Sequence, residues 1–171
     1  MKYILTITDA FTKYAVITVV DNKEAETVAE AIFTEWICRL GIPKEIMTDQ
    51  GKEFTNATLQ EICKLLEVVQ IRTTPYHPQA NAQAEILNKT VAGYLKKFVD
   101  ETTLDWEKYI PALNFAYNTS YHRTIATSPF RLLYGIRPRM PGALMDEKFK
   151  TYSETDSADR FRTLQKARQI A

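Results

Sequence analysis

The 171-residue sequence predicts an α/β domain in which helices pack on a mixed sheet. Hydrophobic residues make up 45% of the chain, which is enough apolar material for a buried core. Two β-rich segments stand together at the start, and amphipathic helical segments alternate with short strands after them. No apolar run approaches the ~18 residues that a membrane-spanning helix needs. These features exclude a disordered chain, a disulfide scaffold and a membrane-spanning protein.

The first two expected elements are strands over residues 2–8 and 13–20. The second segment, KYAVITVV, is rich in β-branched residues, which favour strands. Because side chains alternate along a strand, one face of the first segment carries Tyr3, Leu5, Ile7 and Asp9. Only residues 10–12 separate the two segments, so an antiparallel hairpin is expected.

A helix is expected over residues 23–40. Asp21 and Glu24 have the spacing of a capping box, and Gly41 is a typical C-terminal stop. The expected buried stripe of this helix consists of Val28, Ile32, Phe33, Trp36, Ile37 and Leu40. Cys38 lies on the apolar stripe of this helix and Cys63 on that of the next helix, so both thiols are expected to be buried.

Two further strands are expected over residues 45–48 and 68–72. Between them runs a helix whose apolar residues are Leu59, Ile62, Cys63 and Leu66. Strands that are joined through a helix are expected to be parallel, with right-handed crossovers. The second half of the chain is expected to be helical after a polar loop over 73–81, with helices over 82–99, around 106–117 and from Ser128 to near Tyr134. The long helix over 82–99 has an apolar stripe of Leu87, Val91, Tyr94, Leu95 and Phe98. Residues 1–145 are expected to form the domain, and residues 146–171 an extension that is partly helical or disordered.

Three carboxylates follow elements of this fold in a suggestive way. Asp9 ends the first strand, Asp49 follows the third, and Glu85 opens the long helix on its polar side, away from Leu87 and Val91. The carboxyl ends of neighbouring strands are where open α/β sheets place their sites. Three carboxylates together repel one another unless cations compensate, and Mg²⁺ prefers oxygen ligands. By themselves, however, three acids among 21 are most often solvated surface charges.

The surrounding sequence favours the functional interpretation. Asp49 and Glu85 are separated by 35 residues, and the segment between them ends in TPYHPQANAQAE, followed by Asn88 and Lys89. Other motifs are DAFTKY from Asp9, FAYN from Phe115, and SPFRLLYG from Ser128, with Pro138 and Arg139 after it. Together these motifs strongly resemble the catalytic core of a retroviral-type integrase, specifically that of gypsy-type LTR retrotransposons. The resemblance covers about residues 2–141.

The resemblance implies an RNase H-like fold, with a mixed five-stranded sheet and helices on both faces. It also implies a DDE polynucleotidyl transferase in which Asp9, Asp49 and Glu85 bind two Mg²⁺ ions, for which Mn²⁺ can substitute. Such an enzyme removes the 3′ end of the element's DNA and then joins the new 3′-hydroxyl to target DNA. The implied partners are double-stranded DNA, from element ends and target, and further copies of the chain in a homodimer or higher homo-oligomer. The implied location is the nucleus, after a cytoplasmic particle.

Asn81, Gln83, Asn88 and Lys89 are candidates for DNA contact. Asn81 is equally well suited to be the N-cap of the long helix. Net charge supports a polyanionic partner, because residues 1–70 carry a balance of −4 and residues 71–171 a balance of +5. Ala82 departs from the family pattern, where a glycine is usual; the position is either strained or simply helical.

Two other functions compete with an active integrase core. The chain resembles an integrase without its flanking domains, so a non-catalytic DNA- or chromatin-binding domain derived from an integrase is the main alternative. A simple RNase H-like nuclease using the same metal ions is another. The intact set of three acids favours an enzyme over a binding domain, and the YHPQ loop with the 35-residue interval favours an integrase over a nuclease.

Overall fold

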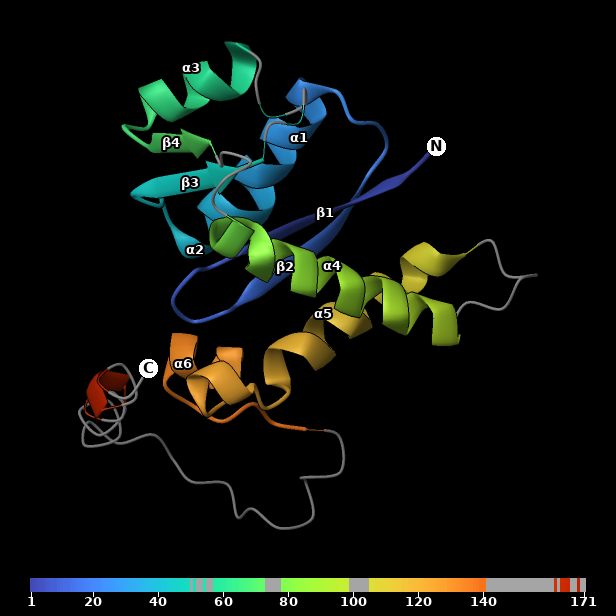
Figure 1. Cartoon of the computed structure of the whole chain (residues 1–171), viewed down its shortest axis with the longest axis vertical. Coiled ribbons are helices and arrows are strands. Elements are labelled where there is room, and N and C mark those ends of the chain that lie inside the picture. The colour runs from blue at the N-terminus through green and yellow to red at the C-terminus, as the bar shows by residue number, and fades with distance from the viewer. Residues whose placement is uncertain are drawn as a thin grey trace. The chain divides into compact units, whose positions relative to one another are not determined.

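The computed structural model describes residues 1–49, 51, 54, 57–72, 78–98, 105–140, 162, 164–166 and 169, with the backbone alone at 72, 78–82 and 98. Figure 1 shows the elements in chain order: β1 (Tyr3–Thr8), β2 (Ala15–Val20), α1 (Ala25–Ile32), the π-helical η1 (Phe33–Ile37), α2 (Cys38–Leu40), β3 (Glu45–Thr48), α3 (Ala57–Leu65), β4 (Val69–Arg72), α4 (Pro78–Phe98), the 3₁₀ helix η2 (Trp106–Tyr109), α5 (Ile110–Thr119), the 3₁₀ helix η3 (Arg123–Ile125) and α6 (Pro129–Tyr134). The chain forms two compact units, residues 1–8 with 16–114 and residues 9–15 with 115–171.

The strands confirm the expected α/β class. β1 pairs with β2, and β3 pairs with β4 in parallel, from Glu45 opposite Val69 to Thr48 opposite Arg72. The connection over residues 9–14 is too short for a parallel crossover, so β1 and β2 form the expected antiparallel hairpin. All four strands located in the sequence are present. These four strands form two two-stranded sheets. The fifth strand of the expected five-stranded sheet is not seen in the part of the chain that the structure describes.

β1 is covered on both faces within the first unit. Leu5 joins the main apolar cluster, and Tyr3 and Ile7 pack against it from the same face. Thr6, on the opposite face, donates a hydrogen bond from its hydroxyl to Asn88 Oδ1 of α4 at 2.9 Å. Figure 1 shows α4 running across β1. The cluster itself consists of Leu5, Val20, Val28, Ala29, Ile32, Ile37, Leu59, Cys63 and Val68.

The first helical region contains a π-helical turn that the periodicity argument missed. Its buried residues are Val28, Ala29, Ile32 and Ile37, so the step from Ile32 to Ile37 is five residues instead of four. A π turn accommodates one extra residue and rotates everything after it by about one position. Ile37 therefore stays on the core side, whereas Phe33, which was expected in the buried stripe, is 44% exposed.

The same rotation corrects the expectation for one cysteine. Cys63 on α3 is buried as expected, but Cys38, directly after the π turn, is exposed. The capping box was also wrong, because the helix begins at Ala25 and its N-cap Glu24 makes no side-chain cap. Instead, Asn22 Oδ1 accepts the backbone N–H of Glu24 at 2.9 Å. Gly41 ends the region at φ +94°, as expected of a C-terminal glycine.

The helices of the second half lie close to their expected positions. Pro111 falls in the first turn of α5, and Ser128 caps α6 by accepting the N–H of Arg131. α6 ends at Gly135, whose φ of +73° favours glycine. A Cβ at this position would lie 2.5 Å from Cγ of Leu164, so the Leu164 side chain would have to move. Most of the expected extension over 146–171 lies outside the described residues.

None of the described helices combines the length and the apolar character that a membrane crossing requires.

The π turn leads to a test with a thiol reagent. Burial raises the pKa of the Cys63 thiol, so at about pH 8 the folded protein holds less Cys63 thiolate than an exposed cysteine would. We expect the native protein to react quickly at Cys38 and slowly at Cys63, and both thiols to react equally fast after unfolding. Two slow native thiols would contradict the rotation at η1; Cys38→Ser and Cys63→Ser variants assign the two phases.

Candidate active site of three carboxylates

Asp9 comes directly after the last residue of β1 and is half-buried. Its Oδ2 accepts two hydrogen bonds at 2.6 Å, one from the backbone N–H and one from the hydroxyl of Thr12. Thr12 is only 3% exposed, so both bonds are partly buried. The Asp9 carboxylate is therefore oriented by its own turn. Sequence reasoning missed Thr12, although an Asp followed by Thr three residues later is a known side-chain turn signal.

Asp49 comes directly after the last residue of β3 and is exposed. Its Oδ1 accepts the backbone N–H of Gly51 at 2.9 Å, which is the geometry of an Asx turn. Thr48, its neighbour in β3, is opposite Arg72 in the parallel pair with β4. The second carboxylate is thus also oriented locally at the carboxyl end of a strand, as the sequence predicted.

Glu85 lies on the exposed side of α4, opposite Leu87, which is fully buried, and Val91, which is 3% exposed. One turn further on, Asn88 is exposed as a whole residue but bonds to Thr6 of β1. This bond docks the turn of α4 that carries Glu85 on the strand whose end leads into Asp9. The expected outward direction of Glu85 is confirmed.

The beginning of α4 corrects two expectations. The helix starts at Pro78, which suits a first turn, and not at Ala82. Asn81 therefore lies inside the helix and is not its N-cap; its side chain lies outside the described residues. Ala82 has helical backbone, so this position does not require a glycine. Gln83 is half-buried and Lys89 is exposed; their DNA contacts remain predictions. Tyr94, expected on the apolar stripe, is 39% exposed.

Lysines near the end of α4 line two hollows of the first unit. Lys89 and Lys97 lie with Tyr94 in a shallow hollow of about 240 Å³. Lys96 lines a larger hollow of about 570 Å³ together with Lys2 and residues Tyr3, Ile4, Leu95 and Trp106. In this larger hollow the positive charge of Lys2 is paired with a carboxylate, since Lys2 Nζ lies 2.6 Å from Glu107 Oε2.

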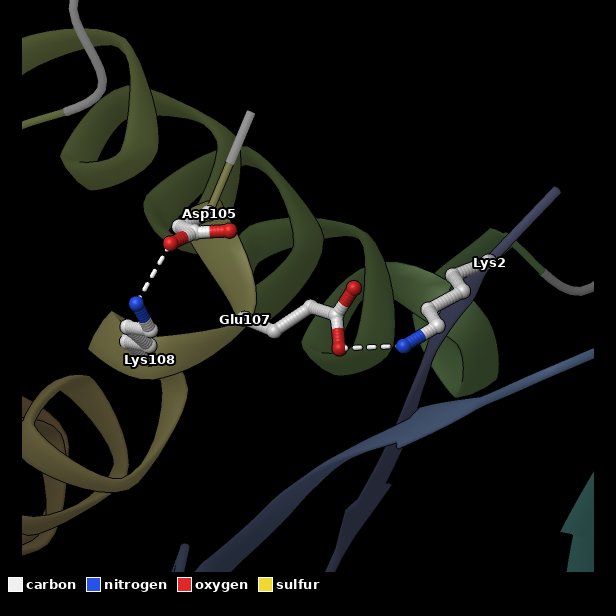
Figure 2. A network of polar contacts seen from close by, with 4 residues as sticks. All are labelled: Lys2, Asp105, Glu107 and Lys108. Atoms are coloured by element: carbon white, nitrogen blue, oxygen red, sulfur yellow. Dashed lines mark hydrogen bonds and ion pairs between the residues drawn. The ribbon is translucent and has the colours of Figure 1, made fainter. Parts of the chain in front are cut away.

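Figure 2 shows these ion pairs at η2. Lys108 bonds to Asp105 and Lys2 bonds to Glu107. The hydrogen bond to Glu107 raises the pKa of Lys2, and the bond to Asp105 raises the pKa of Lys108 and lowers that of Asp105. Lys108 is therefore neutralised locally and contributes little to attraction of a polyanion.

The donor chemistry of the three acids fits a hard divalent cation, because all three offer carboxylate oxygens. Asp49 and Glu85 belong to the first compact unit, and Asp9 belongs to the second. Within the described residues, no three Asp, Glu, His or Cys side chains are gathered closely enough to hold a metal ion. Each acid is thus placed on the expected element, and their joint coordination of a cation remains a prediction.

This chain is similar to proteins of one known family and to curated relatives over most of its length. Residues 1–78 match the family described as integrase core domain. The retrovirus-related Pol polyprotein from transposon 412 of Drosophila melanogaster is 29% identical over 140 residues, which cover 82% of this chain and 11% of the polyprotein. Gypsy retrotransposon integrase-like protein 1 of Bos taurus is 29% identical over 139 residues, 81% of this chain and 28% of that protein. The chain thus spans less than a third of the length of these relatives.

A solved structure confirms the fold. The catalytic core domain of BIV integrase superimposes with a TM-score of 0.65 at 18% identity, over 77% of this chain and 85% of that one. This similarity shows the RNase H-like fold that the sequence motifs implied. The matched family, the relatives and the fold agree with the motifs around Asp9, Asp49 and Glu85. The chain belongs to the integrase core domains of the retroviral and gypsy-retrotransposon type.

Proposed function

We propose that this chain is the catalytic core of a DNA integrase, a DDE polynucleotidyl transferase that processes the 3′ ends of retroelement DNA and joins them to target DNA. The proposal is carried by the placement of the two aspartates. Asp9 and Asp49 each follow the last residue of a strand, and both lie in the segment that matches the integrase core family. Glu85 adds a third carboxylate on the exposed side of α4.

The three carboxylates would together hold two Mg²⁺ ions, or Mn²⁺ in their place. When bound, such ions lower the pKa of the attacking oxygen and balance the charge that develops at phosphorus. The first reaction is attack of water on a phosphodiester near the 3′ end, and the second is attack of the new 3′-hydroxyl on a phosphodiester of target DNA. The turns at Asp9 and Asp49 orient one oxygen of each carboxylate before any cation binds, which reduces the ordering that catalysis requires.

DNA binding is proposed for the polar side of α4. Lys89 lies one turn after Glu85 and lines a hollow with Tyr94 and Lys97. Lysine ammonium groups bind phosphate oxygens without reading sequence, and an aromatic ring at the same place offers a stacking surface. Gln83 and Asn81 are proposed to contact DNA on the turns before. The amide oxygen of Asn88 is engaged with Thr6, so its amide nitrogen is the group we propose for DNA.

Self-association and a nuclear site of action belong to the same proposal. The chain is proposed to act as a homodimer or higher homo-oligomer, because Phe33 on η1 and Tyr109 on η2 expose aromatic surface. Sedimentation at rising protein concentration tests this point, and a strict monomer would contradict it.

The proposed substrate, target DNA, would be reached in the nucleus. Imaging of the tagged chain checks this location.

Asp49→Asn tests the chemistry. The variant keeps the shape and the acceptor for the Gly51 N–H but removes one negative charge from the proposed cation site. We expect a loss of most phosphoryl transfer, roughly 100-fold or more if a shared ligand is lost, with DNA binding unchanged or tighter. The assay is strand transfer and its reversal, the disintegration-like reaction, on short duplexes with Mg²⁺ or Mn²⁺.

Glu45→Gln is the matched control for this experiment, because Glu45 is an exposed acid at the other end of β3. It removes the same charge from the same strand and should keep full activity. Full activity of Asp49→Asn would refute the mechanism. Tight DNA binding by the unmutated chain without any phosphoryl transfer, with either metal, would favour the non-catalytic binding domain.

Lys89→Gln combined with Lys97→Gln tests the DNA surface. If both ammonium groups contact phosphates, the slope of log K against log salt concentration should become shallower by about 1.8, since each contact contributes about 0.9. Lys44→Gln combined with Lys64→Gln, two exposed lysines outside α4, serves as the charge-matched control. Binding to short duplex DNA is measured by fluorescence anisotropy at several salt concentrations. Equal slopes for the double variant and the unmutated chain would place the DNA elsewhere.

A further inference from the structure

Asn118, in the last turns of α5, makes two hydrogen bonds to one residue of the hairpin. Its Oδ1 accepts the backbone N–H of Ala15 at 2.8 Å, and its Nδ2 donates to the carbonyl of Ala15 at 2.7 Å. Both residues belong to the second compact unit. Asn118 is 3% exposed and Ala15 is completely buried. The side-chain amide therefore pairs with Ala15 as a neighbouring strand would, at a place that water does not reach.

Hydrogen bonds continue from Ala15 back to Asp9 through the turn. The carbonyl of Tyr14 accepts the N–H of Asp9 at 2.9 Å, and Tyr14 donates its own N–H to the hydroxyl of Thr12 at 3.2 Å. That hydroxyl donates in turn to Asp9 Oδ2. The turn is closed again by the bond from Lys13 N–H to the Asp9 carbonyl at 3.0 Å. Hydrogen bonds thus connect Asp9 to Tyr14, the residue directly before Ala15.

The turn also has a conformation that needs support from outside. Lys13 has a φ of +62°, in the left-handed region that non-glycine residues rarely adopt. Such a residue persists when surrounding structure holds it in place. Tyr14, next in the chain, packs its ring edge-on against Tyr134 of α6, with centroids 5.8 Å apart. Asn118 and Tyr134 therefore hold the end of the turn from two helices of the second unit.

We propose that Asn118 is a positioning residue for Asp9: by clamping Ala15, it fixes the turn that orients the Asp9 carboxylate for cation binding. This inference rests on the proposed function, since it gives the orientation of Asp9 a purpose. An asparagine suits the task because its side chain carries one acceptor and one donor in the spacing of a peptide group. A leucine of similar volume has neither group and would leave the N–H and carbonyl of Ala15 buried without these partners.

Two variants remove the clamp, and one control removes buried apolar volume from the same helix. Asn118→Leu removes both hydrogen bonds, and Asn118→Ser leaves room for water at Ala15, so that a folded protein is available even if the leucine variant does not fold. Leu113→Ala is the control, because Leu113 is buried on the same helix and does not contact the turn through any bond described above. The three proteins are compared with the unmutated chain at temperatures where each is equally folded.

The first readout is independent of activity. Amide hydrogen exchange at Thr12 and Ala15 should accelerate at least tenfold in the Asn118 variants and stay unchanged in Leu113→Ala. The second is Mn²⁺ affinity by calorimetry, expected to weaken about 10- to 100-fold, as is usual when a group that orients a metal ligand is lost. The third is phosphoryl transfer, where kcat should fall by a similar factor while KM for DNA stays within about twofold.

The outcomes separate this inference from the proposed function. Unchanged exchange at Thr12 and Ala15 would overturn it, and so would accelerated exchange with unchanged Mn²⁺ affinity and kcat. Equal losses in Leu113→Ala would show a general effect of destabilisation and overturn it as well. An unmutated chain that binds Mn²⁺ but transfers no phosphoryl group would refute only the proposed function. Amide hydrogen exchange and Mn²⁺ affinity, compared between the variants, would then still decide the role of Asn118.

Discussion

The contacts that β1 makes on both of its faces are the constraint on which the rest of the site depends. Its odd-numbered side chains enter the apolar cluster with α1 and α3, and Thr6 on the other face holds α4 through Asn88. A strand fixed from both sides cannot shift in register without exposing one apolar face. The end of β1 at Thr8 is therefore well determined, and Asp9 follows it directly in the chain. The same bond between Thr6 and Asn88 also determines which part of α4 lies against β1, namely the part that carries Glu85.

The carboxylates of Asp9 and Asp49 are each oriented by hydrogen bonds within their own turn. Each aspartate carries hydrogen bonds from its own turn, Asp9 from Thr12 and Asp49 from Gly51. Such bonds fix the side-chain direction of each aspartate without help from the other acids. The proposed site would then be built from separately ordered carboxylates, with a divalent cation supplying the attraction that joins them. Asn118 extends this principle from the side chain of Asp9 to the backbone that carries it.

Sequence reasoning located much of this and failed where contacts are long-range or periodicity changes. The four strands, the stop at Gly41 and the outward direction of Glu85 follow from residue alternation, glycine chemistry and helical phase. The π turn was missed because an α-helical period was assumed throughout, and this misplaced Phe33 and Cys38. Asn118 appeared only as part of a motif, because its partner Ala15 is 103 residues away. The pairing of Asn88 with Thr6 was unreadable for the same reason.

The central claim is that Asp9, Asp49 and Glu85 jointly hold divalent cations. Paramagnetic broadening of backbone amide signals by Mn²⁺ tests it most directly, because broadening depends on the distance of each amide from the bound ion. The account predicts that amides beside all three acids, such as those of Ala10, Gly51 and Ile86, broaden together at the same low Mn²⁺ concentration, and recover when excess Mg²⁺ displaces the ion. Broadening beside Asp49 and Glu85 with sharp signals beside Asp9, or no site-specific broadening at all, would contradict it.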